Sequence, residues 1–124
     1  MHRILIIDDE PALRLLLREA LEGAGYEVEE AQNGTEGLSF HRRRPFHLII
    51  TDIFMPEKDG LEVIKELRHE DEFLPVLAIS GGGQFRSEEA LAVASKLGAS
   101  EVLQKPFALQ QILWSVESAL RTFC

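Results

Sequence analysis

The chain has 124 residues, of which 45% are hydrophobic and 27% charged, a composition that indicates one folded domain over residues 1–124 and argues against disorder. Its 13 lysines and arginines against 21 aspartates and glutamates leave a net charge of −8, which disfavours direct binding to nucleic acid or to an anionic membrane. The single cysteine, Cys124, excludes an internal disulfide, and no apolar run reaches the ~20 residues that cross a bilayer, so we expect a cytoplasmic protein.

Strand-like and helix-like segments alternate from the N-terminus. Residues 4–7 form a short apolar run rich in β-branched side chains, which predicts a strand buried on both faces of a sheet. Pro11 then opens a helix. The predicted apolar stripe of that helix is Leu13, Leu16, Leu17, Ala20 and Leu21. Residues 26–29 alternate apolar and acidic side chains, so the second strand should have one wet face or lie at a sheet edge, and a helix over residues 34–44 follows it.

The second half of the chain repeats the same pattern three times. The predicted strands cover residues 47–51, 75–79 and 101–104, and the helices that follow them begin at Gly60, Ser87 and Leu109. Repeated strand–helix units with right-handed crossovers pack as a parallel sheet with helices on both faces. The sequence therefore predicts an α/β protein with a doubly wound, five-stranded parallel sheet.

Reactive side chains follow four of the five predicted strands. Asp8 and Asp9 end the first strand, Asp52 the third, Ser80 the fourth and Lys105 the fifth. Ligands of open parallel sheets bind at the carboxyl ends of the strands, so these side chains should meet at one rim. When three carboxylates lie this close together, their mutual repulsion is destabilising unless a cation offsets it. A divalent ion and Lys105 are the available cations.

The acidic rim offers oxygen ligands without histidine or cysteine, which favours a hard ion, and a sparse protein shell suits Mg²⁺ better than Ca²⁺. A carboxylate beside Mg²⁺ can attack a phosphoryl group to form an acyl phosphate. Asp52 is the best candidate nucleophile because it stands alone, whereas Asp8 and Asp9 are adjacent and better suited to hold the metal. Ser80 can donate its hydroxyl to one phosphoryl oxygen and Lys105 can pair with another. The four histidines are expected outside this rim.

Four motifs in this order resemble the response-regulator receiver domains, the CheY-like family of two-component signal transduction. They are Asp8-Asp9, Asp52-Ile53-Phe54-Met55-Pro56 with Asp59-Gly60 following, Ser80, and Lys105-Pro106-Phe107. The match spans the entire chain. The resemblance implies a (βα)5 fold with the flavodoxin-like strand order 2-1-3-4-5, and a part in phosphorelay signalling as a phosphoprotein.

The resemblance also implies a role for each acidic residue. Asp52 matches the phosphoacceptor, which takes a phosphoryl group from a sensor histidine kinase, a phosphotransfer protein or a small phosphodonor with Mg²⁺. Asp9, Asp52 and the backbone carbonyl of Phe54 match the direct metal ligands, and Asp8 matches the acid that holds the metal through water. Such a protein catalyses only its own phosphorylation and dephosphorylation, and is otherwise not an enzyme.

The remaining motif residues match the switch of the family. Ser80 matches the switch hydroxyl and Lys105 the lysine that pairs with the phosphate. The bond between Lys105 and Pro106 matches one that is typically cis, consistent with the small trans preference of proline.

Three positions depart from the family pattern. Val102 stands where the family usually has an aromatic residue or histidine, which argues against aromatic gating. The run from Gly81 through Gly82 to Gly83 follows the switch residue and predicts a loop that is mobile until phosphorylation. Phe54 is bulky and apolar where many members are polar, so it can shield the acyl phosphate from water and slow its hydrolysis.

The resemblance places the output surface on the fourth helix, the fifth strand and the fifth helix. Trp114 lies off the apolar stripe of the last helix, so it is either a partly exposed interface anchor or a side chain that fills a groove against the fourth helix. The 124 residues leave no room for a DNA-binding or enzymatic output domain. The chain is therefore expected to be either a stand-alone regulator or a fragment of a longer one, acting on an unknown protein target.

Two other functions are open at this point. A phosphohydrolase of the haloacid dehalogenase type also uses aspartate, Mg²⁺ and lysine, but it carries an acid two residues after its nucleophile, where this chain has Phe54. A receiver-like interaction module that never takes phosphate is the other. The intact set of polar site residues argues against that module: Asp8, Asp9, Asp52, Ser80 and Lys105.

Overall fold

The computed structural model describes residues 1–55, 58–80 and 87–122, which form five parallel strands and five helices in alternation. The strands are β1 (Arg3–Ile7), β2 (Glu27–Ala31), β3 (Leu48–Asp52), β4 (Val76–Ser80) and β5 (Glu101–Gln104). The helices are α1 (Pro11–Gly23), α2 (Gly34–Arg43), α3 (Gly60–Glu70), α4 (Ser87–Leu97) and α5 (Leu109–Thr122). The sheet has the order β2-β1-β3-β4-β5, so the predicted fold and strand order are confirmed.

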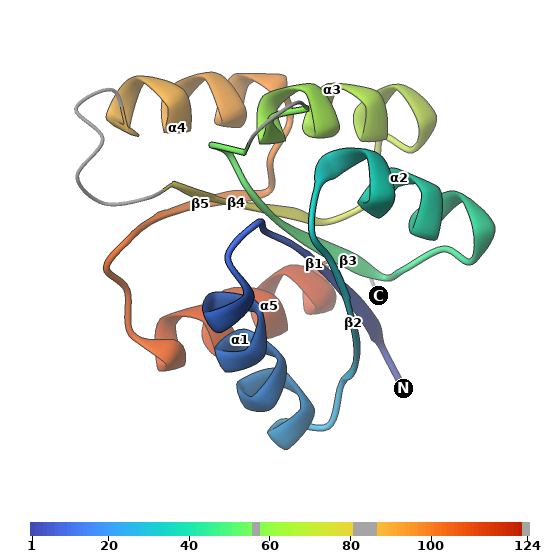
Figure 1. Ribbon diagram of the computed structural model, residues 1–124, viewed down its shortest axis with the longest axis vertical. Helices are drawn as coiled ribbons and strands as arrows, with labels where there is room; N and C mark the ends of the chain where they lie inside the picture. Colours follow the sequence, from blue (N-terminus) through green and yellow to red (C-terminus); the bar gives the residue numbers. More distant parts are fainter. Residues whose placement is uncertain (56–57, 81–86, 123–124) are drawn as a thin grey trace.

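The helices cover the sheet in two layers (Figure 1). Helices α1 and α5 lie on one face, and α2, α3 and α4 lie on the other. Strands β1, β3 and β4 are buried along their whole length, because each has helices on both faces. Two apolar clusters result, one on each side of the sheet. This packing leaves the two ends of the strands as the places where polar groups can gather.

The predicted elements match the observed ones to within two residues at the ends of the strands. Strand β2 lies at the edge of the sheet with Val28 buried and Glu27 and Glu29 exposed, as the alternation predicted. One side chain of the predicted α1 stripe was placed wrongly. Leu16 is 46% exposed, whereas Leu17 and Leu21 are fully buried. The surface of α1 that packs against the sheet is narrower than the apolar stripe. Leu16 therefore lies at the solvent-exposed edge of that contact.

A polar network around Arg3 stabilises the amino ends of the strands, at the edge of the sheet opposite the predicted rim. The buried guanidinium of Arg3 donates to Glu27 and Glu29 of β2, each at 2.7 Å, and to the backbone carbonyls of Arg44 and Pro45 at 3.0 and 2.7 Å. It therefore ties β1 to β2 and to the turn after α2. Within the described residues, no helix combines the length and apolar character that crossing a membrane requires.

His41 makes the stability of this end of the molecule sensitive to pH. Its imidazole is buried in α2, is stacked on Phe46, and accepts a hydrogen bond at Nδ1 from the Phe46 backbone N–H at 3.1 Å. Burial lowers the pKa of His41 below its ordinary value of 6.5. The unfolded chain then binds a proton that the folded chain excludes, so the contribution of His41 to stability is fully present at pH 8 and is lost as the pH falls below about 6.5.

We expect the substitution His41→Asn to remove this part of the pH dependence, because the asparagine oxygen can accept the same hydrogen bond without titrating. Urea unfolding at several pH values from 5 to 8, roughly the range in which histidine titrates, measures it. The difference in unfolding free energy between wild type and variant should change below about 6.5 and stay constant above it. A constant difference over the whole range would contradict the assignment.

Candidate functional site

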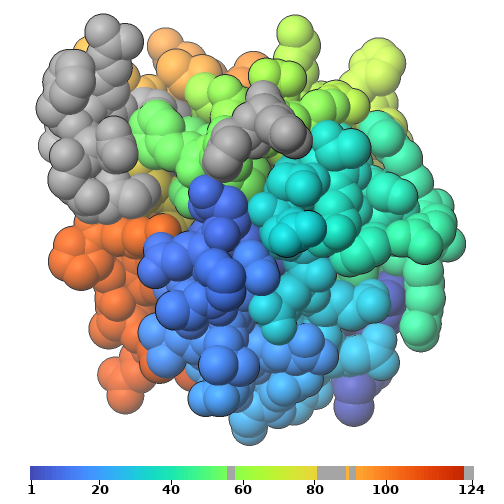
Figure 2. Space-filling model, viewed as in Figure 1, coloured from blue at the N-terminus to red at the C-terminus, as the bar shows by residue number. Residues whose placement is uncertain are grey.

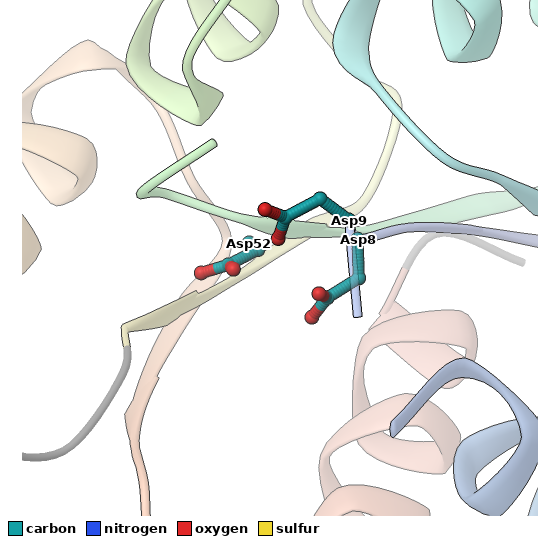
Figure 3. Close-up of side chains that lie close together, drawn as sticks. All are labelled: Asp8, Asp9 and Asp52. Carbon is teal, nitrogen blue, oxygen red and sulfur yellow. The ribbon is translucent and has the colours of Figure 1, made fainter. Parts of the chain in front are cut away.

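Three carboxylates meet at the carboxyl ends of β1 and β3, as the sequence predicted. Asp8 and Asp9 follow the last residue of β1, and Asp52 is the last residue of β3. Strands β1 and β3 are adjacent and parallel, and Ile7 is in register with Thr51. Asp8, which follows Ile7, and Asp52, which follows Thr51, therefore lie side by side. One oxygen from each carboxylate lies within 4.8 Å of the other two (Figure 3).

The protein surroundings make two of these carboxylates costly to charge. Asp8 is 2% exposed and Asp52 is 6% exposed, whereas Asp9 faces solvent. Burial raises the pKa of Asp52 to about 7, and repulsion from the Asp8 carboxylate adds to the effect. Burial likewise raises the pKa of Asp8. A nearby positive charge would therefore stabilise the ionised carboxylates of Asp8 and Asp52.

Lys105 brings one positive charge to the site. Its Nζ lies 3.8 Å from Oδ2 of Asp8, and its backbone N–H donates to the carbonyl of Ser80 at 2.8 Å. The peptide bond between Lys105 and Pro106 is cis, as the resemblance implied. Ser80 is fully buried at the end of β4, the strand next to β3. The ends of four strands thus supply the carboxylates, the hydroxyl and the ammonium to one edge of the sheet.

The donor atoms fit a magnesium ion. Oδ1 of Asp8 accepts a hydrogen bond from the Glu10 backbone N–H at 2.8 Å, but Oδ2 is buried and has no hydrogen-bond partner among the described residues. An orphaned carboxylate oxygen beside two further carboxylates is the oxygen donor set that suits a hard divalent cation. Among the residues that the structure describes, this is the one cluster of three acidic, histidine or cysteine side chains with metal-site spacing.

Phe54 and Trp114 both have exposed side chains. Phe54 is 38% exposed beside the acidic cluster, and its backbone N–H donates a long hydrogen bond of 3.4 Å to Oδ1 of Asp52. Trp114 is 61% exposed on α5, so of the two alternatives that the sequence left open the structure favours an exposed side chain over one that fills a groove against α4. Val102 is half-buried in β5 and packs against the core on the α4 side. The predictions for Pro56 and for Gly81 to Gly83 concern residues outside those that the structure describes.

The histidines lie away from the cluster, as expected. His41 lies in the last turn of α2 and His69 in the last turn of α3, and the rings of His2 and His47 lie 5.1 Å apart next to the first residues of β1 and β3. The amino ends of parallel strands and the last turns of the helices between them are at the edge opposite to Asp52, so histidine has no part in this donor set.

Two residues shape the site without having been given a part in it from the sequence. Gly60 begins α3 and donates its N–H to the carbonyl of Ile53 at 2.8 Å. A Cβ added at Gly60 would lie only 2.1 Å from the carbonyl oxygen of Asp52. Arg14 of α1 donates to the carbonyl of Asp8 at 2.6 Å. The motif Asp59-Gly60 was a usable signal for the glycine, whereas nothing in the sequence identifies the partner of Arg14.

Comparisons with known proteins agree with this geometry. The family described as "Response regulator receiver domain" matches residues 4–117. Response regulators MprA from Mycobacterium sp. (strain KMS) and Mycobacterium leprae are each 38% identical over 119 residues, which is 96% of this chain and 50% and 51% of theirs. The chain thus spans about half the length of these curated relatives.

Solved structures give the same result over almost the whole chain. A response regulator receiver domain protein from Clostridium thermocellum has a TM-score of 0.90 at 29% identity, with 98% of this chain and 96% of that one covered. The receiver domain of NtrX from Brucella abortus has a TM-score of 0.89 at 31% identity, with 96% and 98% covered. Fold, acidic rim and sequence therefore agree, and the chain belongs to the response regulator receiver domain family of two-component systems.

Proposed function

We propose that Asp52 is a phosphoacceptor that receives its phosphoryl group from a sensor histidine kinase, a phosphotransfer protein or a small phosphodonor. The observation that carries the proposal is the convergence of Asp8, Asp9 and Asp52. One oxygen of each carboxylate lies within 4.8 Å of the other two, and Oδ2 of Asp8 has no hydrogen-bond partner among the described residues. A cluster of this kind is destabilising by itself, because like charges are buried together. It becomes favourable where it binds a cation and a reacting phosphoryl group.

The chemical step is an in-line displacement at phosphorus. A carboxylate oxygen of Asp52 attacks the phosphorus atom, the new O–P bond forms, and the bond from phosphorus to the donor's leaving group breaks, so that an acyl phosphate remains on Asp52. Lys105 then pairs with one phosphoryl oxygen, and the Ser80 hydroxyl donates to another. The ammonium group already lies within 3.8 Å of Asp8, at the edge of the acidic cluster.

Asp9, Asp52 and the backbone carbonyl of Phe54 would hold Mg²⁺ directly, and Asp8 would hold it through water. When bound, the ion offsets the negative charge that develops on the phosphoryl oxygens. The residues of the chain have separate tasks. Asp52 supplies the nucleophilic oxygen, while the buried Asp8 presents an oxygen, Oδ2, that accepts no hydrogen bond among the described residues and lies 3.8 Å from the Lys105 ammonium.

Phosphorylation would act on the surface formed by α4, β5 and α5. The phosphoryl group biases an equilibrium between inactive and active arrangements that the free protein already samples. Ser80 and Lys105 supply the differential contacts, since they end β4 and follow β5 on that side of the sheet. The exposed Trp114 of α5 is the large apolar side chain that a downstream protein partner would contact there.

Incubation with acetyl phosphate and Mg²⁺ followed by intact-mass measurement tests the function. The wild-type chain should gain one phosphoryl group, and the gain should be abolished by EDTA and by Asp52→Asn. Turnover of many donor molecules would instead indicate a phosphohydrolase, and an unchanged mass would indicate a phosphorylation-independent interaction module. Phosphorylation that persisted in EDTA or in Asp52→Asn would refute the proposed site.

Phe54 should set the lifetime of the acyl phosphate. Its apolar side chain stands at the rim two residues after Asp52, where it can exclude the attacking water. We expect Phe54→Asn to lose its phosphoryl group severalfold faster than wild type after the donor is removed, and Phe54→Leu, which keeps an apolar side chain, to stay near the wild-type rate. Intact-mass measurement over time gives the three rates. Equal rates for all three proteins would show that this side chain does not shield the phosphate.

A further inference from the structure

Asp8 is held at three points, two on its backbone and one on its carboxylate, and its second carboxylate oxygen accepts no hydrogen bond among the described residues. Its N–H donates to the carbonyl of Ala31 at 3.1 Å, and its own carbonyl accepts from Nη1 of Arg14 at 2.6 Å. Oδ1 accepts from the Glu10 N–H at 2.8 Å. Oδ2 is therefore the oxygen that these bonds leave for the acidic cluster, where it lies buried.

Arg14 is itself held in a fixed direction. Its Nε donates to Oε1 of Glu30 at 3.0 Å, while Nη1 reaches the Asp8 carbonyl, so one planar guanidinium joins β2 to the end of β1. Its side chain is only 15% exposed, and that of Glu30 is 23% exposed. In Figure 2, α1 in blue lies beside the cyan segment that includes the end of β2 on the face in view. The contact is thus largely shielded from water.

The carbonyl that Arg14 holds belongs to the peptide unit that joins Asp8 to Asp9. A peptide unit is planar, so fixing its oxygen also fixes the direction in which the chain leaves toward the Cα of Asp9. One hydrogen bond therefore constrains two of the three carboxylates of the cluster. Arg14 has no contact with any of the three carboxylate groups among the described interactions.

We propose that Arg14, aligned by Glu30, is a positioning residue that sets the direction in which Asp8 and Asp9 present their carboxylates to the magnesium site. The inference rests on the proposed function, because it assumes that the cluster binds Mg²⁺. It adds a residue that acts through the backbone rather than through the cation or the phosphate. Residues that orient ligands in this way typically change metal affinity by roughly 10- to 100-fold when they are removed.

The structure supplies a matched control. Arg18, one turn later in α1, also donates to Glu30, at 3.0 Å, and pairs with Glu22, but it makes no hydrogen bond to Asp8 among the described interactions. If Arg14 served only to attach α1 to β2, replacing either arginine would have the same effect. Arg14→Met and Arg18→Met remove the same charge and keep an unbranched apolar side chain.

The test measures Mg²⁺ affinity from the dependence of the urea unfolding midpoint on Mg²⁺ concentration, with EDTA as the metal-free reference. We expect Arg14→Met to bind Mg²⁺ about tenfold more weakly than wild type, and Arg18→Met to stay within about twofold. Acetyl phosphate labelling of Arg14→Met should be slow at low Mg²⁺ and should recover toward the wild-type rate at saturating Mg²⁺. Arg14→Lys, which keeps the positive charge but lacks the planar fork that contacts both acceptors, should restore part of the affinity.

Equal Mg²⁺ affinities for Arg14→Met and Arg18→Met would overturn the inference, as would an Arg14→Met rate that stays low at saturating Mg²⁺. If Arg14→Met does not fold in EDTA, the comparison of Arg14→Lys with Arg18→Lys decides by the same criterion. A wild-type protein that shows neither Mg²⁺ stabilisation nor labelling would instead refute the proposed function, so the two failures are distinguishable.

Discussion

Asp52→Asn is expected to be more stable than wild type when Mg²⁺ is chelated at pH 8. Burial and, to a smaller extent, repulsion from Asp8 raise the pKa of Asp52 from 3.8 to about 7. Folding at pH 8 therefore places a charged carboxylate in a buried position next to another carboxylate. At about 1.4 kcal/mol per pKa unit, the gain in unfolding free energy is roughly 4 kcal/mol at most. The asparagine oxygen can still accept the hydrogen bond that the Phe54 N–H donates to Asp52.

Urea unfolding in EDTA measures this gain, and Asp71→Asn is the control. That substitution makes the same change in net charge at the C-cap of α3, away from the acidic cluster, and should shift stability little. Added Mg²⁺ should then stabilise the wild type and Asp71→Asn in proportion to ligand binding, but Asp52→Asn much less. A loss of stability in Asp52→Asn without metal would show that the three carboxylates are not in mutual repulsion.

The sequence was sufficient for the arrangement of the site because it depends on topology. Asp8 and Asp52 follow short apolar runs that predict buried parallel strands, and parallel strands with right-handed crossovers bring their carboxyl ends to one edge. Lys105 and Ser80 were placed by the same reasoning. The strand ends were off by one or two residues, which did not matter, because these polar residues mark where each buried run stops.

Contacts between distant segments could not be predicted in this way. The guanidinium of Arg14 has one partner in β2 and one just after β1, and helical periodicity says only which face of α1 it occupies. Arg42, in the last turn of α2, likewise pairs with Glu66 and Glu70 of α3, and neither partner follows from the pattern of its own helix. Leu16 shows the same difficulty for apolar residues, because the width of the contact between α1 and the sheet depends on how α5 packs beside it.

Gly60→Ala is expected to destabilise the protein and impair the site together. A Cβ at this position would lie 2.1 Å from the Asp52 carbonyl oxygen and 2.7 Å from the Cα of Ile53. Both obstacles are backbone atoms, so no side-chain rotation relieves them, and α3 must move away from the end of β3. Overpacking of this kind costs about 3 kcal/mol, and here the displaced backbone carries the proposed nucleophile.

Gly23→Ala is the matched control for Gly60→Ala, since an added Cβ at Gly23 meets nothing within 4 Å and the residue lies in the last turn of α1. Alanine there should leave stability unchanged or raise it by about 0.5 kcal/mol, because glycine loses more backbone freedom on folding. Urea unfolding gives both changes, and acetyl phosphate labelling at saturating Mg²⁺ should be slowed in Gly60→Ala alone. If Gly60→Ala kept both wild-type stability and wild-type labelling, the close approach of α3 to Asp52 could not be a constraint on the site.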